Sequence, residues 1–252
     1  MHASIIYLDT DLGVKMKNNK IAILILAHDN KNQLIKLINQ LKPDFDIFVH
    51  IDKKAKIKIS SDKNVYIFSA YNVYWGSFNL IRVILRLFEE SYKIGYERYV
   101  LISGRDLPII SNKKIIEYFS NNSNEYLSYE KLPISGLGDN GGFDRVQYYY
   151  QNKIRGEINI YCHMGNLISS HIFRLLKKIM KHYGYTRKIQ ITLYAGGTWI
   201  NITHSCLEYI LNYLAENKYY YKRFKYTRCG DEIFFQTIIC NSKYIKLLLM
   251  TH

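Results

Sequence analysis

Short apolar runs alternate with amphipathic segments along the first half of the chain, and this pattern limits the folds that the chain can adopt. The clearest run, Ile21–Ala27, is apolar throughout, as expected of a strand that is buried on both faces of a sheet. Strands that alternate with helices are typical of an α/β fold with a mostly parallel central sheet flanked by helices. We predict strands at residues 21–27, 46–51, 65–68, 99–103 and 125–129, and helices at 33–41, 80–88 and 113–119.

The second half of the chain has a weaker pattern. Residues 133–150 are rich in glycine and then in aromatic and basic residues, which predicts a long functional loop. Residues 1–19 have no clear periodicity, so we expect a poorly ordered leader followed by a single domain over residues 20–252. Helices are predicted at 173–183, at 205–214 and from Asp231 onward, and a strand at 196–202.

The composition favours an anionic partner. The chain of 252 residues has 35 Lys and Arg against 21 Asp and Glu, so its formal net charge is +14. Nucleic acid, an anionic membrane surface and a polyanionic small substrate all suit such a protein, and composition does not choose among them. No apolar run approaches the roughly 20 residues that a membrane span needs. The four cysteines lack the spacing of metal ligands, which favours reduced and mostly buried thiols.

Polar residues follow three of the predicted strands. These clusters are residues 28–30, residues 50–54 and residues 103–106. Each cluster by itself suits an ordinary turn or helix cap. Ligands of parallel α/β sheets bind at the carboxyl ends of the strands, however, and three clusters at that edge together favour a nucleotide-binding site.

Six segments, taken in chain order, resemble one family. They are His28-Asp29-Asn30, Val49–Lys54, Tyr74–Ser77, Leu101–Pro108, Gly196–Trp199 and Gly230–Thr237. Together they resemble the core-2/I-branching β-1,6-N-acetylglucosaminyltransferases and their peptide O-xylosyltransferase relatives, over about residues 20–241, in a bacterial-type member. The resemblance implies a GT-A-type, Rossmann-like fold with a nucleotide half at about 20–130 and an acceptor and catalytic half at about 131–252.

The resemblance also implies an activity. Members of this family transfer a sugar from a UDP-sugar to a hydroxyl with inversion and without a required metal. The donor expected here carries N-acetylglucosamine or xylose, and the acceptor is a glycan, lipid-linked or protein hydroxyl. We therefore expect no cofactor other than the UDP-sugar co-substrate, and a role in surface polysaccharide assembly.

The family's functional residues map onto positions of this chain. Glu232 corresponds to the general base that removes the proton of the acceptor hydroxyl. Its alternative role, with Asp231, is an acidic helix start that is stabilised by the helix dipole. The donor-binding candidates are His28, Asp52, Lys54, Trp75, Ser103 and Asp106, and the acceptor-binding candidates are Arg145, Trp199 and Asp231. Each tryptophan suits the protein core equally well, and His50 is best interpreted as a hydrogen-bonded core histidine.

The leaving diphosphate needs a metal ion or fixed cations to balance its charge. Metal-dependent GT-A enzymes use an Asp-x-Asp motif after a central strand, whereas residues 103–106 contain one carboxylate, Asp106. Asp9–Asp11 and Asp44–Asp46 have the spacing at other locations, so no metal site is expected. The cationic candidates are Lys153, Arg155, Lys222, Arg223 and Arg228, although each also suits a solvated surface.

Two alternatives remain open at this stage. The chain ends at His252, before the segment with which relatives hold the diphosphate, so it is expected to be a fragment, a short variant or a catalytically impaired member. The tyrosine runs at 148–150 and 219–221, with basic neighbours, also suit a nucleic-acid-binding protein, but no nucleic-acid motif accompanies them. We favour the glycosyltransferase, cytoplasmic and held peripherally at the anionic inner face of the cell membrane, without a nucleic-acid partner.

Overall fold

The computed structural model describes residues 21–150 and 160–249, with the side chains of the long helix described from residue 171 onward. The predicted leader, including Asp9 and Asp11, lies outside the described residues. So do the cationic candidates Lys153 and Arg155.

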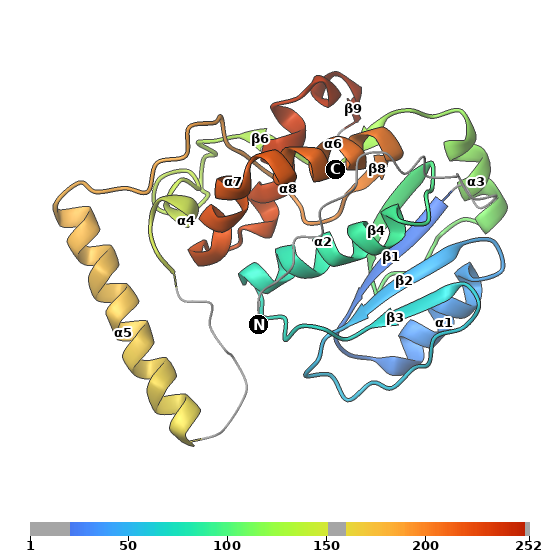
Figure 1. Cartoon of the computed structure of the whole chain (residues 1–252), viewed down its shortest axis with the longest axis horizontal. Helices are drawn as coiled ribbons and strands as arrows, with labels where there is room; N and C mark the ends of the chain where they lie inside the picture. The colour runs from blue at the N-terminus through green and yellow to red at the C-terminus, as the bar shows by residue number, and fades with distance from the viewer. Residues whose placement is uncertain (1–20, 151–159, 250–252) are drawn as a thin grey trace.

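The centre of the fold is one seven-stranded sheet in the order β3-β2-β1-β4-β8-β5-β9 (Figure 1). The four strands β1 to β4 are parallel, whereas β8 is antiparallel to both β4 and β5. The bounds are Ile21–Ala27 for β1, Asp46–Ile51 for β2, Val65–Phe68 for β3, Arg98–Ser103 for β4, Glu125–Tyr126 for β5, Asn201–Thr203 for β8 and Leu248–Leu249 for β9. The α/β fold with a mostly parallel central sheet, predicted from the sequence, is confirmed.

Helices cover both faces of this sheet, and β1 explains why. Alternate side chains of a strand point to opposite faces. Ile23 and Ile25 pack with α1 (Lys31–Leu41) in one core, and α3 (Asn112–Ser120) flanks that core. Ala22 and Leu24 lie in a second core. Its helices are α2 (Phe78–Tyr92), α6 (His204–Glu216) and α8 (Asp231–Cys240).

The second half differs from the prediction in three places. The expected strand at 125–129 pairs in the main sheet over Glu125–Tyr126 alone. Within the expected strand at 196–202, only residues 201–202 are strand, as part of β8, and the residues before them form a loop. The preceding strand, β7 (Tyr194–Ala195), pairs with β6 (Glu130–Lys131) in a separate sheet. The expected loop at 133–150 contains a short helix, α4 (Asp144–Gln147). The remaining elements are α7 (Lys218–Arg223), η1 (Phe224–Tyr226) and η2 (Lys243–Leu247).

The longest helix, α5 (Ile160–His182), lies at the outside of the molecule, beyond α4 (Figure 1). No helix within the described ranges has the length and hydropathy required to cross a bilayer.

Three of the cysteines, Cys206, Cys229 and Cys240, are buried free thiols, as expected. The side chain of Cys162 lies outside the described residues.

Candidate active site

The carboxyl ends of β1, β2 and β4 meet at one edge of the sheet. The backbone N–H of Asp52 donates to the carbonyl of Ala27 over 2.7 Å, and the N–H of Gly104 donates to the carbonyl of Leu26 over 2.8 Å. A Cβ at position 104 would lie 3.0 Å from the Cβ of Ala27, so this close approach favours glycine. The three polar clusters of the sequence therefore lie side by side, as the strand pattern predicted.

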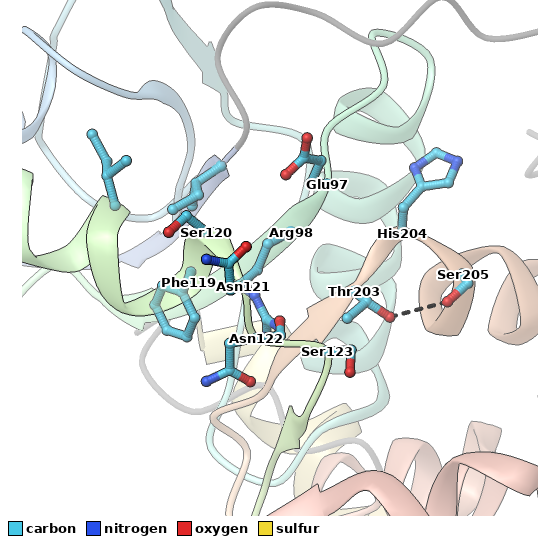
Figure 2. A pocket seen from close by; sticks show the side chains of 12 residues that line it. Glu97, Arg98, Phe119, Ser120, Asn121, Asn122, Ser123, Thr203, His204 and Ser205 are labelled. Atoms are coloured by element: carbon cyan, nitrogen blue, oxygen red, sulfur yellow. Dashed lines mark hydrogen bonds between the residues drawn. The ribbon is translucent and has the colours of Figure 1, made fainter.

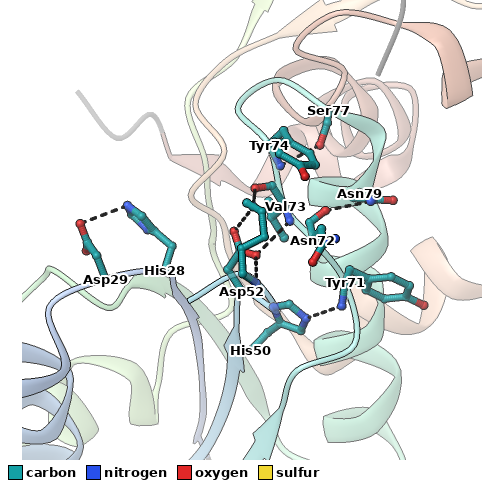
Figure 3. A network of polar contacts seen from close by, with 11 residues as sticks. His28, Asp29, His50, Asp52, Tyr71, Asn72, Val73, Tyr74, Ser77 and Asn79 are labelled. Carbon is teal, nitrogen blue, oxygen red and sulfur yellow. Dashed lines mark hydrogen bonds and ion pairs between the residues drawn. The ribbon is translucent and has the colours of Figure 1, made fainter. Parts of the chain in front are cut away.

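Asp52 joins the end of β2 to the loop before α2 (Figure 3). Its carboxylate accepts from the Lys54 ammonium over 2.5 Å and from the backbone N–H of Val73 over 3.3 Å. The Lys54 ammonium also donates to the Val73 carbonyl and lies 4.1 Å from the ring centroid of Tyr74. Asp52 is almost completely buried, and Lys54 compensates its charge. Its bond to Val73 holds this loop in place.

His50 has a structural role in the same network, as the sequence suggested. Its Nε2 accepts hydrogen bonds from the backbone N–H groups of Ala70 and Tyr71 (Figure 3). Accepting at Nε2 requires the neutral ring. Burial lowers the pKa of His50 to about 4, although Asp52 opposes this shift.

The loop that these contacts hold continues into the turn at Trp75-Gly76, which packs against the start of α8. The carbonyl of Gly76 accepts from the N–H of Cys229 over 3.0 Å, and Gly76 has a φ of 66°, which favours glycine. A Cβ at Gly76 would lie 2.9 Å from the Cys229 sulfur. Trp75 is 77% exposed, so its interpretation as a core residue is wrong. The turn brings the carboxyl ends of the strands next to the segment that carries Glu232.

Glu232 lies in the first turn of α8 and forms an ion pair with Arg145 of α4. The Arg145 guanidinium donates to Oε2 of Glu232. The backbone of Arg145 accepts from the N–H of Arg228 over 3.0 Å, which fixes α4 against the start of α8. The Glu232 side chain is 32% exposed.

Asp231 lies behind Glu232 and is almost completely buried. Its Oδ2 accepts from the Thr198 hydroxyl over 2.8 Å, whereas its Oδ1 has no hydrogen-bond partner in the described part of the chain. Burial raises the pKa of Asp231 to about 6, and the Thr198 hydrogen bond opposes this shift. The contact holds Thr198 next to the first turn of α8, and the neighbouring Trp199 is exposed. Asp231 thus positions the loop, and direct contact with an acceptor stays a prediction.

Gly196 allows this loop to fold against Ser128. A Cβ at position 196 would overlap the carbonyl oxygen of Ser128, and a backbone atom cannot move aside easily. The N–H of Gly197 donates to the Ser128 hydroxyl over 2.5 Å, and the Gln236 amide donates to the carbonyl of Gly197 over 2.5 Å. This close approach is the physical reason why the predicted strand at 196–202 is interrupted.

Residues 21–252 match the family described as Core-2/I-Branching enzyme. The chain belongs to this family. Members of this family are glycosyltransferases.

Two solved structures are similar to this chain at low identity. A protein from Desulfovibrio desulfuricans G20, described as a "putative nucleotide-diphospho-sugar transferase", is 10% identical, with 44% of this chain and 58% of that chain covered and a TM-score of 0.28. 4-diphosphocytidyl-2C-methyl-D-erythritol synthase is 11% identical, with 79% of this chain and 80% of that chain covered and a TM-score of 0.34. Scores this low support no functional inference. No curated protein matches.

The other donor-binding candidates of this glycosyltransferase lie at the strand edge. His28 is exposed, with its Nε2 3.5 Å from Asp29. Ser103 and Asp106 form a local turn, in which the N–H of Ser103 donates to Oδ2 of Asp106 over 2.8 Å. Contact of these side chains, or of Lys54, with a nucleotide stays a prediction.

Sequence analysis missed the ion pair between Asp29 and Arg105, which connects the ends of β1 and β4. The signal was present, because two opposite charges follow strands that a parallel sheet places side by side. Thr198 was also missed as a partner of Asp231, and no local pattern identified it.

The cationic candidates have different surroundings. Arg223 is buried, so its interpretation as a surface charge is wrong; its Nε donates to the carbonyl of Lys188 over 3.2 Å at the end of α7. Lys222 and Arg228 are exposed, and Arg228 lies beside Arg145. The described residues contain no group of three or more His, Cys, Asp or Glu that could hold a metal ion. Asp46, of the pair Asp44–Asp46, is buried and accepts from the Tyr96 hydroxyl.

A separate pocket of about 510 Å³ opens at the amino ends of β1 and β4 (Figure 2). It is lined by Ile21 and Arg98, the first residues of these strands, and by the start of α6. Because the polar clusters lie at the carboxyl ends of the same strands, this pocket lies at the other end of the sheet from those clusters.

Proposed function

We propose that this glycosyltransferase transfers a sugar from a UDP-sugar to an acceptor hydroxyl with inversion, and that Glu232 is the general base. One observation carries the proposal. Glu232, a partly exposed carboxylate paired with Arg145, follows Cys229, whose N–H binds the turn at Gly76, and that turn continues from the loop held by Asp52. Donor and base are thereby expected side by side.

The reaction needs one carboxylate at this position. The acceptor oxygen attacks the anomeric carbon as the bond from that carbon to the diphosphate oxygen breaks, so the leaving group is UDP. Glu232 takes the proton of the acceptor hydroxyl. Arg145 occupies Oε2, and no described side chain hydrogen-bonds to Oε1, which suits that oxygen for the proton. Arg145 orients the base, and its charge can also reach the acceptor.

The donor is proposed to lie along the edge formed by His28, the Asp52–Lys54 network and the turn at residues 103–106. The two donors that we expect are UDP-N-acetylglucosamine and UDP-xylose. The single carboxylate at the metal position, Asp106, already accepts a backbone N–H, which supports transfer without a metal ion. Arg228, whose backbone N–H donates to the carbonyl of Arg145, is a second cation near Glu232 and suits the diphosphate.

The acceptor is proposed to contact the exposed ring of Trp199, and the sugar of the donor the exposed ring of Trp75, because an aromatic ring suits the apolar face of a sugar. The acceptor class is a glycan, lipid-linked or protein hydroxyl, used in surface polysaccharide assembly.

Substitution of the base tests the proposal. Glu232→Gln keeps the size of the side chain and removes its basicity, so we expect the transfer rate to fall by about 10²–10⁴. UDP-sugar binding, measured by calorimetry, should persist in the variant. Glu216→Gln, at an exposed position of α6, is the matched control and should transfer normally. Normal turnover by Glu232→Gln would exclude Glu232 as the base.

Two further measurements test the donor and the metal. Calorimetry with UDP-N-acetylglucosamine and UDP-xylose should identify the donor. A chelator should leave transfer unchanged. Complete loss of activity with the chelator, restored by Mn²⁺, would contradict metal-independent transfer.

A further inference from the structure

Helix α5 carries an exposed apolar stripe that the transfer reaction does not explain. Ile172 and Leu175 are each 59% exposed, and Ile179 and Tyr183 are exposed beside them. Spacings of three, four and four residues place these side chains on one helical face, because an α-helix turns once in 3.6 residues. The N–H of Tyr183 donates to the carbonyl of Ile179 over 3.0 Å, so Tyr183 continues the helical row.

A different face of α5 holds the helix to the protein. The Phe173 ring lies 5.9 Å from the Tyr226 ring, and Met180 is buried. The Lys177 ammonium donates to the Tyr150 hydroxyl over 2.9 Å, and Lys181 donates to Asp139 over 2.9 Å. The stripe is therefore not the packing face of the helix.

A basic row runs beside the stripe. His171, Arg174, Lys178 and His182 each stand one residue before an apolar position, and all four are exposed. Residues 171–183 contain no Asp or Glu. Aliphatic side chains with cations along one flank are typical of helices that lie in the surface of an anionic bilayer.

We propose that α5 binds the surface of an anionic lipid bilayer. The stripe enters the boundary between headgroups and acyl chains, while Arg174 and Lys178 lie against lipid phosphates. The formal net charge of +14 draws the whole protein to the same surface.

The proposal places the transfer site near the membrane. Lys177 contacts Tyr150, and the Tyr150 hydroxyl donates to Asp144 over 3.3 Å. Asp144 precedes Arg145, the partner of Glu232. A lipid-linked acceptor would thus be held on the side of the molecule that carries the base. Membrane binding itself does not depend on the proposed chemistry.

Two other occupants fit the stripe less well. A second copy of the chain would bring two basic rows together, which costs electrostatic energy. Nucleic acid would use the cations but would gain no base stacking from Ile172, Leu175 and Ile179. Each tyrosine run also contains a buried ring that cannot stack on a base, namely Tyr148 in the run 148–150 and Tyr220 in the run 219–221.

Vesicle co-sedimentation of the full chain, without donor or acceptor, tests the proposal. The probes are vesicles of phosphatidylcholine alone and vesicles of equimolar phosphatidylcholine and phosphatidylglycerol. We expect binding to the anionic vesicles and at least about tenfold weaker binding by the triple variant Ile172→Ser, Leu175→Ser, Ile179→Ser. The double variant Arg174→Gln, Lys178→Gln should weaken binding by about fivefold per charge.

Matched variants at another surface give the controls. Ile109→Ser changes a 99% exposed aliphatic residue, and Lys113→Gln, Lys114→Gln removes two exposed charges of α3. These controls should bind vesicles like the original chain. Transfer to a soluble acceptor should be unchanged in the α5 variants, which separates this test from that of the base.

The proposal is wrong if the chain does not bind anionic vesicles, or if the triple variant binds them as well as the original chain does. It is also wrong if the chain forms a dimer that the triple substitution dissociates and binds no vesicles. Nucleic-acid binding that depends on Arg174 and Lys178 but not on the stripe would likewise assign the surface to another partner.

Discussion

The strand edge and the region around Glu232 are built in different ways. At the edge, Asp52 pairs with Lys54, two residues away, and Asp29 pairs with Arg105, which is 76 residues away but follows the adjacent strand β4. Around the base, the key contact joins Arg145 and Glu232, which are 87 residues apart.

The two regions also differ in what they leave unbalanced. The charge of Asp52 is compensated by Lys54, so its contacts stabilise the fold. Near the base, Oδ1 of Asp231 is buried without a partner in the described part of the chain, and Trp75 and Trp199 are exposed. The edge is therefore held by paired charges, whereas the start of α8 carries a buried carboxylate oxygen that has no partner among the described residues.

The largest effect on stability is expected for Gly196→Ala, in the loop that packs near Glu232. The new Cβ would overlap the Ser128 carbonyl, so we expect the free energy of unfolding to fall by about 3 kcal/mol. Gly197→Ala is the matched control, because its Cβ would meet only the Ser128 hydroxyl, at 3.1 Å, and should cost less than about 1 kcal/mol. Chemical denaturation measures both values. Equal costs for the two variants would mean that the loop does not need glycine at position 196.

The pH dependence of stability tests the role of His50 at the carboxyl ends of the strands. Because burial lowers its pKa to about 4 from its ordinary 6.5, the unfolded chain takes up a proton first as the pH falls. Stability is then present above pH 6.5 and is lost between pH 6.5 and 4, by roughly 3 kcal/mol.

Denaturation at a series of pH values in this range should show a smaller loss in His50→Gln. His182→Gln, at an exposed position of α5, should retain the dependence of the original chain. A slope that His50→Gln leaves unchanged would place the pH dependence elsewhere.

Asp231 should show the opposite dependence in the region around the base. Burial raises its pKa to about 6 from its ordinary 3.8, so the unfolded chain ionises first as the pH rises. Stability is present below pH 3.8 and is lost as the pH rises through 6, by roughly 3 kcal/mol.

Asp231→Asn should therefore gain stability over the original chain between pH 4 and 7, measured by denaturation. Asp139→Asn is the contrast, since Lys181 lowers the pKa of that exposed carboxyl and any effect should be smaller and opposite in sign. A gain that does not grow with pH would contradict the assignment to Asp231.

The smallest effect on stability is expected for Trp75→Ala. Because the side chain is 77% exposed, the free energy of unfolding should change by less than about 0.5 kcal/mol. Sugar transfer should nevertheless weaken by about tenfold if the ring contacts a sugar. Tyr219→Ala, an exposed aromatic residue of α7, is the control and should leave transfer unchanged. Normal transfer by Trp75→Ala would remove this ring from the substrate site.

Much of the fold was predictable from local pattern. The bounds of β1, β2 and β3 agree with the prediction, and β4 begins one residue earlier, because continuous apolar runs identify buried strands. The strands at 125–129 and 196–202 were predicted too long. Their pairing depends on contacts among β5, β8 and β9, which lie far apart in the sequence.

The sequence by itself determined the α/β class, the polar clusters at the strand ends and the resemblance to the family, because each of these depends on short stretches of consecutive residues. Only the tertiary structure decided that Arg145 meets Glu232, that Thr198 meets Asp231 and that the α5 stripe faces outward. The physical reason is that periodicity reports which face of an element is apolar. Which distant element covers that face, or leaves it exposed, is fixed by packing of the whole chain.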